Sequence, residues 1–287
     1  MEKCNLCPRK CNADRENGRG FCGADGKIRI ARAAPHMWEE PCISGERGSG
    51  AVFFTGCPLH CVFCQNARIS GGGAGREVSA EELSQIFLSL QDMGVHNLNL
   101  VTATQYSDGV IYALEKVKDK LKIPVVWNSG GYERVETLMR LDGLVDIYLP
   151  DIKYMDRELS AKYSHAPDYF ETAAAALSEM VRQCGKKVMC DGLMKRGVIV
   201  RHLILPGASG DSVRIIKWLK ENYTKEEISV SLMSQYTPMP GVPKEISRRI
   251  TTFEAERVKK ALEETEFEGY TQERCSAEAA YIPPFDT

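Results

Sequence analysis

The sequence has neither an excess of basic residues nor a long apolar run. Lysine and arginine number 37 against 39 aspartate and glutamate residues, which gives a formal net charge of -2. A chain with this balance cannot neutralise many phosphates, so we expect no nucleic acid and no anionic membrane as its partner. No apolar stretch of about 18 residues occurs, and no charged start precedes an apolar core. We therefore expect a cytoplasmic protein without a membrane span or signal peptide.

Internal repeats and low-complexity tracts are also missing, which excludes solenoid and disordered architectures. From residue 50 onward, short β-branched runs alternate with helical periodicity, a pattern typical of a parallel sheet built from βα units. A closed barrel needs eight such units and about 250 residues, whereas six units are recognisable here. We predict an α/β fold, a partial (β/α)6 barrel, with strands at 51–55, 97–102, 124–128, 145–150, 198–205 and 228–233.

Helices are predicted between these strands. The best marked covers 79–94, where Ser79 and Glu82 have the spacing of a capping box and Gly94 follows the last apolar position. The glycine-rich stretch 71–77 is interpreted as a flexible connection to this helix. Further amphipathic stretches are found at 110–121, 133–141, 168–184, 211–222 and 252–264, and a short strand or turn is expected at KKVMCD.

Cysteine is abundant for a reducing compartment, where disulfides rarely persist: the chain has 11. Cys57, Cys61 and Cys64 follow the first predicted barrel strand directly, and Phe63 precedes the last of them. Three thiolates on one loop can hold an iron–sulfur cluster and leave one iron open. A structural zinc site normally has four protein ligands, so it would have to recruit His60 or a distant cysteine. The loop position therefore favours an iron–sulfur cluster.

A second cysteine set lies in residues 1–50, which we interpret as a small cysteine-rich segment preceding the barrel at 51–287. Only KIRIARA within it resembles a strand. Its four thiols could close a tetrahedral zinc site or hold a second iron–sulfur cluster, and the spacing does not separate these readings. Zinc would stabilise the segment, whereas a cluster could relay electrons. The set comprises Cys4, Cys7, Cys11 and Cys22; Cys42, Cys184, Cys190 and Cys275 show no ligand spacing.

The pattern C-x3-C-x-(aromatic)-C after the first strand resembles the radical S-adenosylmethionine (radical SAM) superfamily. Over nearly the whole chain the sequence is similar to proteins related to pyruvate formate-lyase activating enzyme. The similar stretches are CNLCPRKCNADRENGRGFCGA, HMWEEPCISGERGSGAVFFTGCPLHCVFCQN, LPDIKY, RHLILPG, SLMSQYTP and AEAAYIPPFD.

This resemblance implies that Cys57, Cys61 and Cys64 hold a [4Fe-4S] cluster whose open iron binds S-adenosylmethionine (SAM). Reductive cleavage of SAM would give a 5′-deoxyadenosyl radical that abstracts hydrogen. The implied partners are an electron donor such as flavodoxin or ferredoxin and, for an activating enzyme, a glycyl radical enzyme. Three alternatives stay open: the same chemistry on a peptide or small molecule, a non-catalytic zinc-ribbon module, and an electron carrier.

The resemblance also points to residues at the ends of the later strands. Thr102 and Thr104 occupy the place of the family's Gly-Gly-Glu, which receives the methionine amino group, and their hydroxyls can accept from an ammonium. Asp151 and Lys153 match the family's Asp-x-Lys, whose lysine is expected at the cofactor carboxylate. Arg201 and His202 are neighbours in a strand, so at most one can face the barrel interior. The remaining cofactor-binding candidates are Phe63, Asn128, Ser129, His202 and Gln235.

Overall fold

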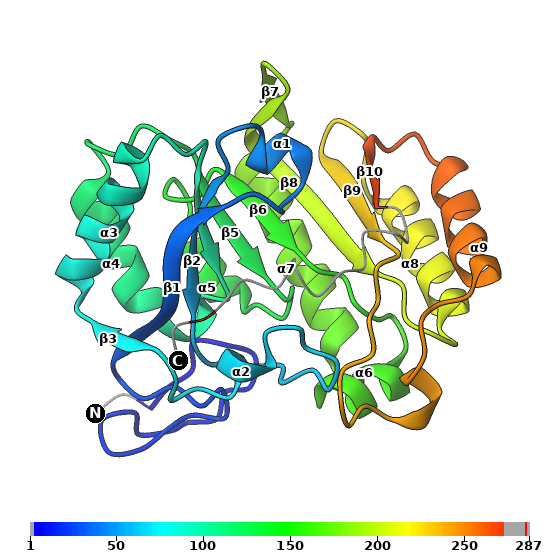
Figure 1. Ribbon diagram of the computed structural model, residues 1–287, viewed down its shortest axis with the longest axis horizontal. Helices are drawn as coiled ribbons and strands as arrows, with labels where there is room; N and C mark the ends of the chain where they lie inside the picture. The colour runs from blue at the N-terminus through cyan, green and yellow to red at the C-terminus, as the bar shows by residue number, and fades with distance from the viewer. Residues whose placement is uncertain (1–2, 273–284, 286–287) are drawn as a thin grey trace.

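A curved sheet of ten strands forms the centre of the computed structural model, which describes residues 3–272 and 285. Seven strands run parallel in the order β10-β9-β8-β6-β5-β4-β2, and β1 and β3 extend the sheet antiparallel beyond β2 (Figure 1). The strands are β1 (Ile28–His36), β2 (Ser49–Phe54), β3 (Arg76–Val78), β4 (Leu98–Val101), β5 (Val125–Ser129), β6 (Ile147–Pro150), β7 (Val188–Cys190), β8 (Leu193–Leu203), β9 (Ile228–Met233) and β10 (Gly269–Gln272).

This arrangement confirms the predicted partial barrel and adds to it. The six predicted strands correspond to β2, β4, β5, β6, β8 and β9, and β10 continues the parallel sheet as a seventh strand. The KKVMCD stretch forms β7, which pairs with β8. Cys275 and most of the AEAAYIPPFD stretch lie outside the described residues.

Helices cover the sheet and connect its strands. In α3 (Ala80–Asp92), Ser79 accepts from the Glu82 backbone and Glu82 accepts in return, which is the predicted capping box. The apolar face of α3 buries Leu83, Phe87 and Leu90. The other helices are α1 (Pro41–Ser44), α2 (Ala67–Ser70), α4 (Ser107–Val117), α5 (Val135–Met139), α6 (Arg157–Ser164), α7 (Tyr169–Cys184), α8 (Ser209–Asn222) and α9 (Thr252–Glu263), with short 3-10 turns η1 (Thr104–Tyr106) and η2 (Lys244–Ile246).

The inner face of the sheet is filled at one end by α1. Cys42 and Ile43 of this helix pack against inward-facing residues of the central strands, and all of these side chains are buried. Alternation along a strand places every second side chain on this face, so the same strands also supply the polar groups described below. The apolar inner residues are Val126, Ile147, Leu149 and Ile199.

The N-terminal segment and the glycine-rich stretch pack closely together. A Cβ on Gly23 would lie 2.1 Å from the Gly71 carbonyl oxygen, and one on Gly72 would lie 2.4 Å from that of Gly23. Both glycines have positive φ, which other residues rarely adopt. Residues 71–75 therefore approach the N-terminal segment closely before β3 begins at Arg76, and the flexible connection stays a prediction. The boundary at residue 50 stays a prediction, although β1 already belongs to the sheet.

Candidate functional site

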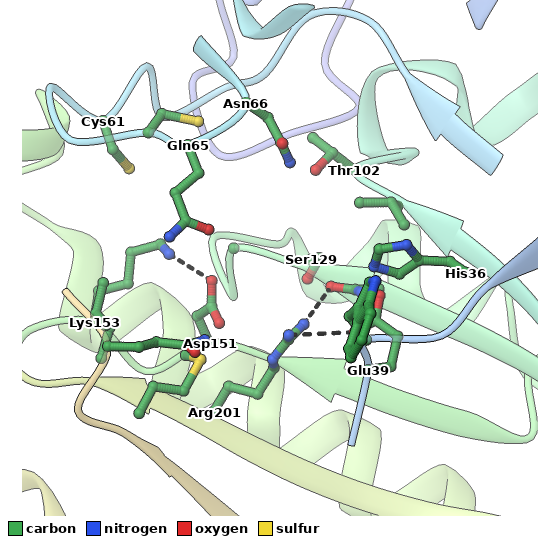
Figure 2. Close-up of a pocket in the computed structure, with 18 of the residues that line it drawn as sticks. His36, Glu39, Cys61, Gln65, Asn66, Thr102, Ser129, Asp151, Lys153 and Arg201 are labelled. Carbon is green, nitrogen blue, oxygen red and sulfur yellow. Dashed lines mark hydrogen bonds and ion pairs between the residues drawn. The ribbon is translucent and has the colours of Figure 1, made fainter. Parts of the chain in front are cut away.

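The loop that follows β2 carries three cysteines into the wall of a large pocket. Cys57, Cys61 and Cys64 line this cavity of about 830 Å³, and Figure 2 shows Cys61 with other residues of its lining. The backbone N–H of Leu59 lies 3.4 Å from the Cys57 sulfur, and the Ser164 hydroxyl donates to the Cys61 sulfur at 3.0 Å. These contacts orient two of the three sulfurs.

The chemistry of this donor set fits an iron–sulfur cluster. Burial, together with the neighbouring thiols, raises the pKa of Cys57 to about 12 and that of Cys64 to about 11. Three thiolates so placed repel one another unless cations lie between them, and the irons of a cluster would supply that charge. Phe63, which lies between Cys61 and Cys64 in the loop, packs edge-on against Tyr154 and Tyr236.

Asp151 and Lys153 face the cysteine loop from the end of β6. Their side chains form an ion pair, and Tyr169 fixes the backbone beneath them by contacting the Asp151 carbonyl at 2.8 Å. Burial opposes the charge on Lys153, yet Asp151 and then Cys61 raise the pKa of its ammonium above the usual range. The pocket thus holds an amine whose charged form is favoured by Asp151 and by the neighbouring Cys61.

Strand ends supply further polar groups to the pocket. Asn128 and Ser129 end β5, Thr102 follows β4, and Gln235 follows β9; all four line the cavity. Thr102 has a φ of 57°, and its backbone N–H donates to the Asn128 carbonyl at 2.8 Å. These predicted residues therefore surround one space together with the cysteines.

Thr104 and His202 do not reach the pocket. The Thr104 hydroxyl is buried and donates to Glu133 at 2.6 Å. His202 is also buried, and its Nδ1 lies 2.6 Å from the Ile152 carbonyl. Because side chains alternate along β8, it is the neighbouring Arg201 that lines the cavity.

Arg201 is the centre of a charged layer that sequence reasoning missed. Its guanidinium lies 3.2 Å from Glu39 and 3.1 Å from Glu40, and donates to Asn128 at 3.2 Å (Figure 2). Asn99 donates to Glu39 as well, at 3.0 Å. Glu39 and Arg201 line the same pocket as the three cysteines. The only sequence signal was the paired acid in HMWEEP.

Glu133 offers a test of the burial around the site. Burial raises the pKa of its carboxyl to about 7, although Thr104 donates to it. Between pH 4.5 and 7 the folded protein holds a proton that the unfolded chain has lost, so stability decreases as pH rises. The difference between the pKa of Glu133 in the folded and in the unfolded protein corresponds to about 3 kcal/mol in the free energy of unfolding. We expect urea denaturation to show that Glu133→Gln removes most of this decrease; equal losses in both proteins between pH 5 and 8 would contradict the assignment.

The N-terminal cysteines gather on one side of the cysteine loop. Cys7 and Cys22 are buried, and the Cβ position of Gly20 is 3.4 Å from the sulfurs of both Cys11 and Cys22. Burial, and then the charges of Cys22 and Cys4, raise the pKa of Cys7 to about 12. Within residues 3–272 and 285, no three Cys, His, Asp or Glu side chains are close enough to hold a single metal ion.

Comparisons with known proteins give the family. A model described as the radical SAM superfamily matches residues 51–245. An uncharacterized protein of Methanocaldococcus jannaschii is 29% identical over 275 residues, which cover 92% of this chain and 74% of that protein.

Three solved structures have a similar fold. A radical SAM methyltransferase from Sphaerobacter thermophilus has a TM-score of 0.54 and 13% identity, over 77% of this chain and 65% of that one. Streptococcus suis SuiB bound to S-adenosylmethionine has a TM-score of 0.52 and 15% identity, over 76% of this chain and 48% of that one. The methylornithine synthase PylB has a TM-score of 0.50 and 17% identity, over 72% of this chain and 59% of that one. The chain thus spans between about half and two thirds of these structures.

Among the described residues, no helix has the length and apolar character needed to cross a membrane. Membership follows from the family match, which covers more than half of the sequence and includes the loop with Cys57, Cys61 and Cys64. The family implies a [4Fe-4S] cluster and SAM, and the pocket carries the thiols that such a cluster needs. The chain belongs to the radical SAM superfamily.

Proposed function

We propose that this protein cleaves SAM reductively and uses the resulting 5′-deoxyadenosyl radical to abstract hydrogen from a substrate. The observation that carries the proposal is the shared pocket, in which three cysteines of one loop face the partly buried Lys153 and the polar ends of β4 and β5. A [4Fe-4S] cluster held by Cys57, Cys61 and Cys64 would supply the electron for cleavage and an open iron for the methionine part of SAM.

The chain's own groups bind and orient SAM. Lys153 binds the carboxylate, and Asp151 holds the ammonium of Lys153 in place through their ion pair. The Thr102 hydroxyl accepts from the SAM amino group, while Asn128 and Ser129 offer an amide and a hydroxyl to the ribose. Phe63, packed between two tyrosines, keeps water from the sulfurs.

The substrate that we favour is a glycyl residue of a partner enzyme, because the sequence resembles activating enzymes. The alternative is a peptide or small molecule, and one sequence feature supports it: no cysteine lies between Cys64 and Cys184. The test is electron paramagnetic resonance after incubation with a glycyl radical enzyme. A glycyl signal that depends on SAM supports activation, and 5′-deoxyadenosine without that signal supports the alternative.

We further propose that Cys4, Cys7, Cys11 and Cys22 bind metal, either zinc or a second iron–sulfur cluster. Cys11 and Cys22 lie beside Gly20, and the charges of Cys22 and Cys4 act on Cys7, which supports metal because neighbouring thiolates need a compensating cation. Metal analysis of the anaerobically purified protein distinguishes the two. Zinc without extra iron supports a structural site.

Lys153 provides the test of SAM binding. We expect Lys153→Met to weaken SAM binding about 10- to 100-fold, since a charge-assisted hydrogen bond contributes about 1.5–3 kcal/mol. Equilibrium dialysis with the reconstituted protein measures this affinity, and 5′-deoxyadenosine is assayed in parallel. The double variant Asp151→Asn/Lys153→Met leaves no unpaired buried carboxylate and controls for folding.

The matched surface control is Lys162→Met, because Lys162 is exposed on α6 and pairs with Glu245 outside the pocket. Unchanged SAM affinity in both Lys153 variants would contradict the assigned role. A wild-type protein that carries its cluster and binds SAM but forms no 5′-deoxyadenosine with dithionite and substrate would contradict the proposed function.

A further inference from the structure

The N-terminal segment contacts the cysteine loop through backbone atoms. The Cys57 N–H donates to the Cys22 carbonyl at 3.1 Å. Nε2 of His60 lies 2.8 Å from the Phe21 carbonyl, and Arg9 donates to the Pro58 carbonyl at 2.7 Å. Figure 1 shows this segment in dark blue beside α2, which follows the cysteine loop. Cys22 is thus one hydrogen bond away from the predicted cluster ligand Cys57, and Phe21 contacts His60, the residue before Cys61.

Phe21 is the exposed residue of this contact. Its side chain is 45% exposed although it is large and apolar. The Arg9 guanidinium lies 4.3 Å from the ring centroid, and the His60 ring packs edge-on at 5.3 Å. Phenylalanine and arginine are both enriched at the cores of protein interfaces relative to the rest of the surface.

The charge of the same segment is opposite to that of the whole chain. Residues 3–27 hold six basic and three acidic residues, whereas the chain has a formal net charge of -2. Lys10 and Arg19 are both exposed, and both precede Phe21 in the sequence. A segment with a net positive charge on an otherwise acidic protein attracts an acidic partner and speeds its association. The six are Lys3, Arg9, Lys10, Arg15, Arg19 and Lys27; the three are Asp14, Glu16 and Asp25.

We propose that residues 3–27 form the docking surface for an acidic one-electron carrier protein, with Phe21 at its centre. The carrier is oxidised by one electron, which passes from Phe21 through the Cys22 carbonyl and its hydrogen bond to Cys57, and then to the cluster that Cys57 holds. No bond is made or broken and no proton moves. This inference rests on the proposed function, since only a chain with a redox cluster in this loop needs such a carrier.

The test compares docking variants with matched variants on a distant surface. Phe21→Ala removes the exposed ring, and Lys10→Glu/Arg19→Glu reverses two charges without changing any residue of the pocket. The controls lie on α9: Phe253→Ala, at a side chain that is 74% exposed, and Lys259→Glu. The probe is flavodoxin, an acidic flavoprotein. Its affinity in the oxidised form is measured by surface plasmon resonance at two salt concentrations.

A second readout follows the reconstituted cluster by its visible absorbance. We expect both docking variants to bind flavodoxin about tenfold more weakly and to be reduced by it correspondingly more slowly, with the charge variant losing most of the salt dependence. Reduction by dithionite should be unchanged in every variant, because this small reductant needs no docking surface.

Two results would overturn the proposal. The first is that the docking variants bind flavodoxin, and have their cluster reduced by it, as well as the α9 controls do. The other is an equal slowing with dithionite, which would assign a structural role to the segment. Failure of the proposed function gives a different result, namely no 5′-deoxyadenosine from the wild-type protein with dithionite. The two failures can be told apart because flavodoxin binding and cluster reduction are measured without SAM.

Discussion

Serine in place of Cys57, Cys61 or Cys64 is expected to remove the cluster and all formation of 5′-deoxyadenosine. Each sulfur is one of only three protein ligands in the proposed cluster, so no remaining thiol of the loop can replace it. After anaerobic reconstitution, iron content and visible absorbance at this site should fall to background in each variant. Product formation from SAM should fall to that of a reaction without enzyme.

The matched controls are Cys42→Ser and Cys184→Ser. Both thiols are buried in apolar clusters, and neither lines the pocket. These variants should keep their iron and their product formation, with at most a modest loss of stability. A variant of Cys57, Cys61 or Cys64 that still forms 5′-deoxyadenosine would contradict the ligand assignment. So would loss of iron in the controls while they stay folded.

Arg201→Leu is expected to cause the largest loss of stability. The guanidinium is shared by Glu39 and Glu40, whose side chains are only 6% and 1% exposed. Without it, two carboxylates remain buried side by side with no cation, and breaking such a buried pair typically costs about 3–5 kcal/mol. Guanidinium chloride denaturation should show a lower midpoint with an unchanged slope.

A triple variant separates this charge effect from a loss of packing. Glu39→Gln/Glu40→Gln/Arg201→Leu removes the buried charges together, so it should recover most of the stability that Arg201→Leu loses. Arg140→Leu serves as the surface control, since its ion pair with Asp108 is exposed and should contribute about 0–1 kcal/mol. If the triple variant were no more stable than Arg201→Leu, the unpaired buried charges would not explain the loss of stability.

The parallel strands were predictable because burial on both faces leaves a continuous apolar run in each of them. The cysteine loop was also predictable, because few folds require three cysteines at this spacing directly after an apolar strand. The start of α3 was predictable because Ser79 and Glu82 have the spacing of a capping box. By contrast, α6 is short and largely polar, and only the Asp156 cap marks its start.

The charged layer could not be predicted in the same way. Glu39 and Arg201 are far apart in the sequence, and only the curvature of the sheet brings them together. Strand alternation did show that Arg201 and His202 face opposite sides, but not which of them faces inward. That choice depends on the register of β8 against β6 and β9. The role of β1 was also missed, because its pairing with β2 is a tertiary contact.

The contact between Gly23 and the glycines after the cysteine loop has a consequence for comparing sequences. Because carbonyl oxygens occupy the space on each side, a side chain at either position would push the two backbones apart. Relatives that keep the N-terminal segment should therefore keep Gly23 and Gly72 as a pair. Relatives that lack the segment can have other residues at the position of Gly72. The alignment columns of Gly23 and Gly72 would therefore distinguish the two groups of relatives.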